Sequence, residues 1–421
     1  MEWLAQAAEH KDRNAPLRCY CTGLLLNGSR KSVEPLAARL APDRVQGMYE
    51  SLHHFVAISP WSDADMLRQV RNYVLSAMQK TGPVTAWVVD ETSFVKKGTH
   101  SVGVARQYCG RLGKKENCQV AVSLSVATAT ASLPIDWQLY LTEEWVKDEE
   151  RRKETHVPEA VQFRTKPQIA LAQIQRAVEE KVPRGVVLAD EVYGSNREFR
   201  EGVADLKLEY SLAVRSTTTV WALGNQPLPP KPWNGKGRQP KRMRRDETHQ
   251  PVTVEQLARS LPEKAWREIS WREGSKGTLQ SRFTALRVRP AYEDDRKVAL
   301  QPEQWLLIEW PVAAEEPSGY WLANLPVKIL LKGLVGISKH RWVIERDYEE
   351  LKSEVGLAHY EGRSWRGFHH HATLCTAAYG FLIAERSRFS PSARVGNLGL
   401  RSPRIPAQFR PRGAKGSRRT T

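Results

Sequence analysis

The chain has 421 residues, which is too long for one small core and predicts two or three domains. Its 64 lysines and arginines exceed its 47 aspartates and glutamates, and the charge of +17 favours nucleic acid as a partner. A basic cytoplasmic protein without such a partner is the alternative. The five cysteines form no paired CxxC, so neither a disulfide framework nor a structural zinc site is indicated. The charged first dozen residues do not resemble a signal peptide, and no apolar stretch reaches membrane-spanning length, so we expect a cytoplasmic, nucleoid-associated protein.

Residues 1–80 are expected to form a helical domain. Amphipathic segments are separated by Gly28, Pro42 and Pro60, and Asp63 is the candidate N-cap of the last one. Basic residues in this domain could bind phosphates, but no helix-turn-helix pattern is evident. A DNA-binding domain and a helical cap on the core therefore both remain open. The segments span residues 18–26, 33–40, 45–55 and 64–78.

Two short apolar runs are each followed by an aspartate. Residues 84–89 precede Asp90, and residues 186–189 precede Asp190. Apolar runs without alternation are typical of strands that are buried on both faces. Functional groups gather at the ends of such strands, whereas a turn former or a helix cap is the alternative for each aspartate. The glutamate after each aspartate would point to the opposite face of an extended strand, so we assign the site to the aspartates.

The residues between the aspartates complete an α/β pattern. Segments 102–108 and 119–127, with a polar turn at 114–117, predict a β-hairpin. Residues 167–180 have helical periodicity and lead into the strand before Asp190, which predicts a crossover within one sheet.

Residues 216–328 predict a β-rich insertion with a basic loop. The first part is rich in proline, glycine, lysine and arginine and cannot bury a core, so it is either a phosphate-binding loop or a solvated one. Trp221, Trp233, Trp266 and Trp271 could stack on an unpaired base, although most tryptophans fill cores. The later runs at 281–288, 305–310 and 320–325 predict strands. The candidate phosphate-binding residues of the loop are Lys241, Arg242, Arg244 and Arg245.

Residues 338–356 are expected to form one amphipathic helix. Its apolar residues recur at i, i+4, i+7 and i+11. Arg341, Glu345 and Lys352 follow the same spacing beside the apolar stripe, so a carboxylate lies between two cations at the edge of the buried face. This arrangement suits a metal and phosphate site, whereas a surface helix with ion pairs is the alternative.

Asp90, Asp190 and Glu345 thus form a candidate cluster of three carboxylates. Carboxylate oxygens are the ligands that Mg²⁺ and Mn²⁺ prefer. Two such ions can activate a water or hydroxyl and stabilise the leaving oxygen in phosphoryl transfer.

The segment after this helix is basic and aromatic. Arg363 and Arg366 flank Trp365 and are candidate phosphate ligands. The consecutive histidines 369–371 do not share a helix face, which favours DNA contacts or helix-start packing over a metal site. The apolar run that follows predicts a helix that closes the core, and residues 386–421 predict a disordered basic tail.

Four blocks together resemble the DDE transposases of bacterial insertion sequences. They are WVVDETSF around Asp90, LADEVYG around Asp190, HRWVIERDYEELK around Glu345, and GLAHYEGRSWRGFHHHATL after it. The branch with a Tyr-Arg-Glu-Lys signature is the most similar, with Arg341 and Lys352 at the expected intervals. Ser338 takes the place of the tyrosine. This departure concerns the DNA contact that the tyrosine makes in the family, and not the metal site.

The resemblance implies an RNase H-like catalytic core, in two parts at 81–215 and 329–385, with the insertion between them. It implies that residues 1–80 recognise transposon ends, and that Asp90, Asp190 and Glu345 hold two Mg²⁺ ions, for which Mn²⁺ can substitute. Cleavage of double-stranded DNA and joining of the 3′-hydroxyl to target DNA would follow, on a homodimer, with Arg341 and Lys352 on the phosphates.

Two other functions remain open from the sequence. One is a stand-alone metal-dependent DNA nuclease, and the other is a catalytically silent DNA-binding protein. The recognised end sequence, the target preference and the cleavage pathway are not encoded in any pattern that we can interpret.

Overall fold

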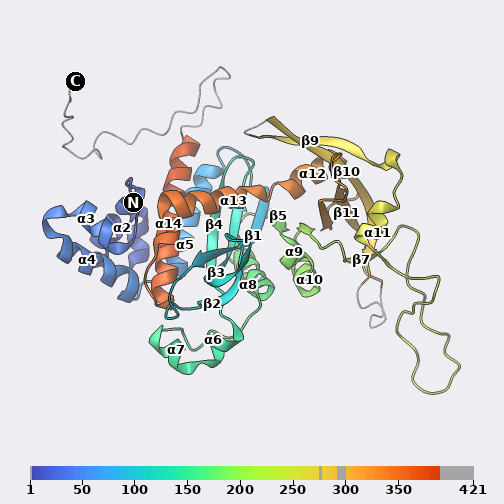
Figure 1. Cartoon of the computed structure of the whole chain (residues 1–421), viewed down its shortest axis with the longest axis horizontal. Coiled ribbons are helices and arrows are strands. Elements are labelled where there is room, and N and C mark those ends of the chain that lie inside the picture. Colours follow the sequence, from blue (N-terminus) through green and yellow to red (C-terminus); the bar gives the residue numbers. More distant parts are fainter. Residues whose placement is uncertain (1, 275–276, 292–299, 389–421) are drawn as a thin grey trace.

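The computed structural model of the chain describes residues 2–274, 277–291 and 300–388. Its centre is a mixed β-sheet with helices on both faces, and further strands extend the sheet at one edge (Figure 1). This architecture confirms the predicted α/β class, with helices at the N-terminus and a β-rich insertion. The expected basic tail beyond Arg388 lies outside the described residues. No helix in the described ranges is long and apolar enough to cross a bilayer.

Four antiparallel strands form the first half of the central sheet. They are β1 (Ala86–Val95), β2 (Ala105–Cys109), β3 (Lys114–Ala127) and β4 (Ser132–Leu139). β1 pairs with β3 over its whole length, and β2 and β4 pair with the other edge of β3. The predicted hairpin is confirmed, but its turn lies at 110–113 and not at 114–117, where β3 has already begun. Gly113 ends this turn with a φ of +64°, which favours glycine.

The second half of the central sheet is parallel. β5 (Val186–Ala189) pairs with β1, and β6 (Tyr210–Ala213) pairs with β5. The crossover helix before β5 is α8 (Lys166–Glu179), which begins with a capping box between Thr165 and Gln168. The predicted crossover is therefore confirmed. The other helices of this half are α6 (Glu143–Lys147), α7 (Glu149–Glu154), α9 (Glu191–Gly194) and α10 (Arg197–Asp205).

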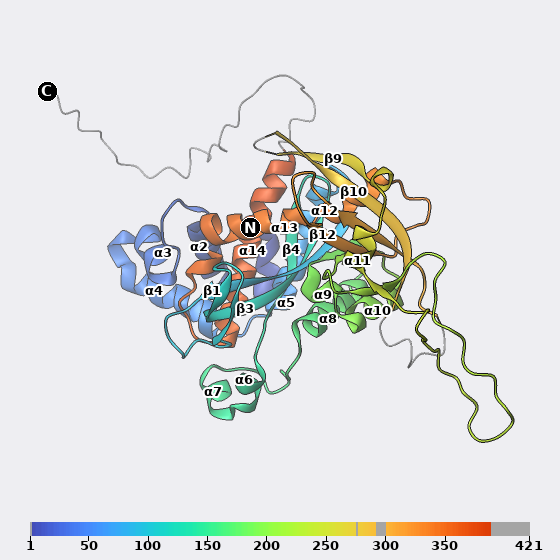
Figure 2. The ribbon, with the colours of Figure 1, turned by 45° about the vertical axis from the view of Figure 1, so that its right-hand side comes forward.

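The strands of the insertion continue the central sheet. They are β7 (Thr219–Trp221), β8 (Val252–Thr253), β9 (Arg267–Gly274), β10 (Gly277–Pro290), β11 (Gln304–Glu309) and β12 (Gly319–Ala323), with the helix α11 (Val254–Arg259). β12 pairs with β6, so the strand order is β2-β3-β1-β5-β6-β12-β11-β10-β7-β8. The three predicted strands are confirmed, and β9 is an additional one. The basic loop between β7 and β8 projects away from the sheet (Figure 2).

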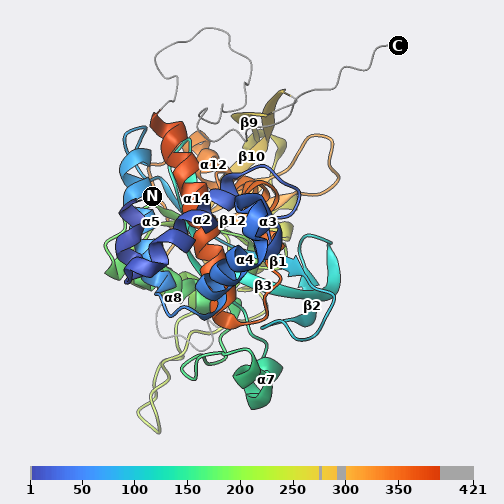
Figure 3. The ribbon, with the colours of Figure 1, turned by 90° about the vertical axis from the view of Figure 1, so that its left-hand side faces the viewer.

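The N-terminal helices pack against the core. Leu17, Leu24 and Leu52 belong to the same buried cluster as residues of β1. The N-cap of the last N-terminal helix is Ser62, which accepts from the backbone of Asp65, and not Asp63. Figure 3 shows these helices beside the long C-terminal helix α14 (Trp365–Arg388). They are α1 (Glu2–Ala5), α2 (Asn14–Leu25), α3 (Val33–Leu40), α4 (Val45–His53) and α5 (Asp63–Met78).

The predicted helix at 338–356 is divided in the structure. Ser338 belongs to α12 (Leu331–Lys339), whereas Glu345 lies in α13 (Trp342–Glu349). A π-helical turn (Glu350–Val355) extends α13, and Gly356 ends it with a φ of +93°. The single-helix prediction was wrong, because a turn at residues 340–341 separates α12 from α13.

Candidate active site

Asp90 lies in β1, and Asp190 directly follows β5, the parallel neighbour of β1. β1 pairs with β5 up to Val88↔Leu188, two residues before each aspartate. Because neighbouring strands lie about 4.8 Å apart, the two residues are close in space. β1 continues along β3, so Asp90 lies within a strand and not at its end. Asp190 follows β5 and caps α9, its Oδ1 accepting from the Val192 N–H at 2.9 Å, so the helix-cap alternative also applies to it.

Arg341 joins the first carboxylate to the third. Its Nη1 donates to Asp90 Oδ2 at 2.6 Å, and its Nη2 donates to Glu345 Oε1 at 3.1 Å. Arg341 stands directly before α13 and Glu345 lies in its first turn, so the i, i+4 spacing brings them together. The Arg341 guanidinium therefore offsets the negative charge of two of the three predicted site carboxylates.

Asp90 and Glu345 lie in different environments. Asp90 is 9 % exposed, whereas the side chain of Glu345 is 65 % exposed. Burial raises the pKa of Asp90 to about 7; Arg341 opposes this rise, and the charge of Asp190 adds to it. A nearby cation stabilises the charged form of a buried carboxyl group and so opposes the rise of its pKa.

The donor set fits a hard divalent cation in its chemistry. Carboxylate oxygens are the preferred ligands of Mg²⁺ and Mn²⁺. Among the described residues, however, no three aspartate, glutamate, histidine or cysteine side chains already surround one point as ligands. Since Arg341 pairs with both Asp90 and Glu345, its guanidinium has to move before both could hold the same ion.

Lys352 does not lie in one row with Arg341 and Glu345. The π-helical turn after α13 widens the helix and changes the direction of Lys352. Its Nζ donates to the carbonyl oxygen of Ser93 at 3.1 Å and lies 5.3 Å from the ring centre of Phe94. Burial lowers the pKa of Lys352 to about 8. Of the two expected cations, Arg341 pairs with Glu345, whereas Lys352 contacts β1 near Asp90.

A pocket of about 590 Å³ opens beside the carboxylates. Asp190, Arg341 and Glu345 line it from the core, and Trp271 lines it from the insertion. Ser338 is buried in its wall, where its hydroxyl contacts Ser211 Oγ at 2.7 Å. The insertion therefore completes a pocket whose other wall carries two of the predicted catalytic residues.

Cations lie over the aromatic rings of this pocket. Lys339 Nζ is 4.8 Å from the ring centre of Trp271, and the Arg272 guanidinium is 3.7 Å from that of Trp342. Trp271 was predicted from the sequence, whereas Arg272 of β9, Lys339 of α12 and Trp342 of α13 were not, because no local pattern brings these three elements together. Trp221 is 1 % exposed and fills the core, which excludes it from base stacking. Rings and cations side by side suit a base and its phosphate.

The predicted phosphate-binding residues of the basic loop differ in their contacts. Arg244 Nε donates to the carbonyl oxygen of Pro229 at 3.0 Å, and Arg245 donates to that of Ala291. These two arginines therefore tie the loop to itself and to β10. Lys241 and Arg242 are exposed and remain available for a partner.

The other predicted phosphate ligands lie at the start of α14. Arg363 is exposed, and Arg366 Nη1 donates to the carbonyl oxygen of Ile58 in the N-terminal segment at 2.8 Å. In the described structure their contacts are not with the three carboxylates. The adjacent histidines 369–371 are buried and bond mainly to backbone groups, as helix-start packing requires.

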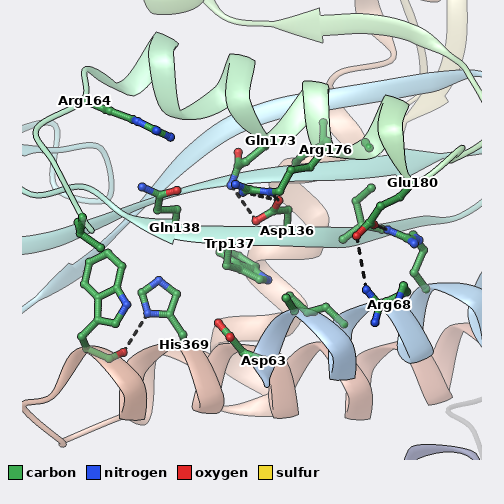
Figure 4. Close-up of a pocket in the computed structure, with 18 of the residues that line it drawn as sticks. Asp63, Arg68, Asp136, Trp137, Gln138, Arg164, Gln173, Arg176, Glu180 and His369 are labelled. Carbon is green, nitrogen blue, oxygen red and sulfur yellow. Dashed lines mark hydrogen bonds and ion pairs between the residues drawn. The ribbon is translucent and has the colours of Figure 1, made fainter. Parts of the chain in front are cut away.

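A second pocket, of about 340 Å³, lies at the edge of β4 between α5 and α8 (Figure 4). Most of its charges neutralise one another. Arg176 Nη2 binds Asp136 Oδ2 at 2.7 Å, and Glu180 faces Arg68 at 3.8 Å. None of the three carboxylates lines this pocket, so it is not part of the candidate active site.

The chain is similar in sequence to known proteins. Residues 4–278, more than half of the chain, match the family model described as DDE superfamily endonuclease. The chain is also 31 % identical over 212 residues to the "Probable transposase for insertion sequence element IS701" of Microchaete diplosiphon. This alignment covers 50 % of the chain and 51 % of that relative, so the chain spans about half the length of the curated relative it matches. On the strength of the family match, the chain belongs to the DDE superfamily endonucleases.

Proposed function

We propose that the protein is a DNA transposase that binds transposon ends, cleaves them and joins the 3′-hydroxyl to target DNA. The observation that carries this proposal is the placement of Asp90, Asp190 and Glu345 around Arg341, beside a pocket lined by rings and cations. Membership of the DDE endonucleases supports phosphodiester chemistry, and the printed name of the relative supports transposition.

DDE superfamily endonucleases are generally dependent on divalent metal ions. In our proposal Asp90, Asp190 and Glu345 hold two Mg²⁺ ions, for which Mn²⁺ can substitute. When bound, these ions supply an activated water or 3′-hydroxyl and stabilise the leaving oxygen. Arg341, once released from its two carboxylates, can hold a phosphate of the cut strand through its planar fork of donors.

The surrounding surfaces take the rest of the DNA in this proposal. Trp271 and Trp342 would stack on an unpaired base in the pocket, with the phosphate on neighbouring cations. Lys241 and Arg242 would contact the DNA backbone from the projecting loop. Residues 1–80 would recognise the transposon end, and a homodimer would bring two ends together on the chromosome.

The test is cleavage and joining of a labelled duplex that carries the element's own ends, with Mg²⁺ and with EDTA. We expect metal-dependent cleavage at the end, followed by joined products. Asp90→Asn should reduce cleavage by more than the roughly 10–100-fold typical of residues that only support a metal ligand, while end binding is retained. The matched control is Glu198→Gln, which alters an exposed acid of α10 that does not line the pocket and should cleave normally.

The outcomes separate the alternative functions. Cleavage without joined products would indicate a stand-alone nuclease. Tight binding without cleavage under any divalent metal would indicate a silent DNA-binding protein. Full cleavage by Asp90→Asn would refute the catalytic assignment itself.

A further inference from the structure

The sheet itself does not hold the two aspartates of the candidate active site together. The parallel pairing of β1 with β5 ends at Val88↔Leu188, before Asp90 and Asp190 are reached. Beyond that point, in the described structure, β1 pairs with β3 on its other side. The two carboxylates also repel each other when both are charged. Another contact has to set their separation.

Glu91 and Tyr193 bridge this gap on the opposite face of the sheet. The Tyr193 hydroxyl donates to Glu91 Oε2 at 3.0 Å, and Lys166 Nζ donates to Oε1 at 2.5 Å. Tyr193 is fully buried and the Glu91 side chain is only 19 % exposed, so water competes little for this bond. Gly194 lets α9 lie directly on β6, because a Cβ there would be 1.8 Å from the carbonyl oxygen of Ala213. The position of Tyr193 is therefore firmly set.

Each end of this bridge is bonded to one aspartate. The Glu91 N–H donates to Asp90 Oδ1 at 2.8 Å. The N–H of Val192, the residue before Tyr193, donates to Asp190 Oδ1 at 2.9 Å. A movement of Tyr193 relative to Glu91 therefore changes the distance between the two carboxylates.

We propose that Tyr193 and Glu91 are positioning residues, whose hydrogen bond sets the separation of Asp90 and Asp190 for binding a divalent cation. Both act from the face of the sheet opposite the carboxylates, and neither has to touch the cation or the DNA. The inference rests on the proposed function, because it requires the two aspartates to be metal ligands.

Mn²⁺ binding to the full-length chain tests this inference, by calorimetric titration and by electron paramagnetic resonance of the free ion. Tyr193→Phe removes only the bridging hydroxyl, and its Mn²⁺ affinity should fall about 10–100-fold, as is typical when the support of a metal ligand is lost. Binding to end DNA in EDTA should not change. In cleavage assays the half-saturating Mg²⁺ concentration should rise by a similar factor, while the rate at saturating Mg²⁺ changes much less. Glu91→Gln keeps an acceptor for Tyr193 and should bind Mn²⁺ nearly as wild type does, unlike Glu91→Ala.

Tyr20→Phe is the matched control. Tyr20 is also fully buried, and its hydroxyl contacts His371 Nδ1 at 2.9 Å in another part of the molecule. This variant should lose comparable stability and keep the wild-type Mn²⁺ affinity. Wild-type affinity in Tyr193→Phe, or an equal loss in Tyr20→Phe, would overturn the positioning inference alone. Wild type could bind no Mn²⁺, or Asp90→Asn could retain all the Mn²⁺ that wild type binds. In either case the proposed function would fail, and the inference with it.

Discussion

Among the single residues, Arg341 connects two of the predicted site carboxylates. It contacts Asp90 and Glu345 at once, so its positive charge offsets both carboxylates. A buried carboxylate that loses such a partner is left with an uncompensated charge. The stability of the metal-free protein should therefore depend on this arginine.

Arg341→Gln should lower the free energy of unfolding by about 1–3 kcal/mol in EDTA, because it leaves Asp90 without its charged donor. Added Mn²⁺ should raise the stability of this variant more than that of wild type, since the ion then supplies the missing positive charge. Urea denaturation with and without Mn²⁺ measures both effects. Arg363→Gln, at an exposed position, is the control and should behave as wild type. An equal response of Arg341→Gln and wild type to Mn²⁺ would contradict the prediction.

His371 gives the molecule a defined pH dependence. Its Nε2 donates to the carbonyl oxygen of Gly356 at 3.1 Å, so its Nδ1 accepts from Tyr20. Burial lowers the pKa of His371 to about 4, below the value of 6.5 expected in the unfolded chain. The folded state therefore binds fewer protons than the unfolded state between these values, and stability falls as the pH falls.

From pH 7 to pH 5 this histidine should reduce the free energy of unfolding by about 2 kcal/mol. His371→Gln keeps one donor and one acceptor but does not titrate, so the loss between pH 7 and pH 5 should be smaller by that amount. Urea denaturation at the two pH values provides the comparison. The exposed His100→Gln should leave the pH dependence unchanged. The same pH dependence in His371→Gln and wild type would show that His371 is not the responsible group.

At the level of elements, the N-terminal segment contacts the π-helical turn that follows α13. Lys31 is 4 % exposed, and its Nζ donates to the carbonyl oxygens of Leu24 and Glu354. These carbonyls belong to α2 and to the π-helical turn after α13. The first helices of the chain thus help to position the helix that carries Glu345.

Lys31→Met should reduce the free energy of unfolding by about 1–3 kcal/mol, because it leaves two carbonyl oxygens without their donor. Lys97→Met changes an exposed lysine and should stay within about 0.5 kcal/mol of wild type. Urea denaturation compares the two variants. Equal stabilities would mean that the N-terminal segment does not stabilise the end of this helix.

At the level of the whole molecule, the charge of +17 predicts DNA binding that weakens with salt. The logarithm of the binding constant falls with the logarithm of the salt concentration by about 0.9 for each phosphate contacted. Lys241 and Arg242 are exposed on the loop that projects from the sheet (Figures 1 and 2). They are therefore available to contact DNA at a distance from the candidate active site.

The double variant Lys241→Gln, Arg242→Gln should reduce the slope of this salt dependence by about 2. Fluorescence anisotropy of labelled DNA at several salt concentrations measures the slope. Lys147→Gln, Lys153→Gln removes the same charge from exposed positions on α6 and α7, and tests whether net charge alone is responsible. Equal slopes in the two double variants would show that the loop makes no specific phosphate contact.

The sequence by itself determined the α/β class and the residues of the candidate site. Apolar runs predict buried strands because local hydrophobicity decides which segments are buried. Asp190 does follow its strand, whereas β1 continues beyond Asp90 as far as Val95. The i, i+4 spacing of Arg341 and Glu345 likewise depends only on helix geometry. Glu91 was assigned to the opposite face by strand alternation, and it does face away from Asp90 in the structure.

Only the tertiary structure decided how these elements meet. The bond between Arg341 and Asp90 joins residues 251 positions apart, and no local pattern specifies it. The same is true of Arg272 over Trp342, which requires the insertion to continue the central sheet beyond β6. The turn before α13 and the π-helical turn after it are likewise not encoded by hydrophobic periodicity. Local sequence sets which face of an element is buried, whereas the partners of that face are chosen by long-range packing of the whole chain.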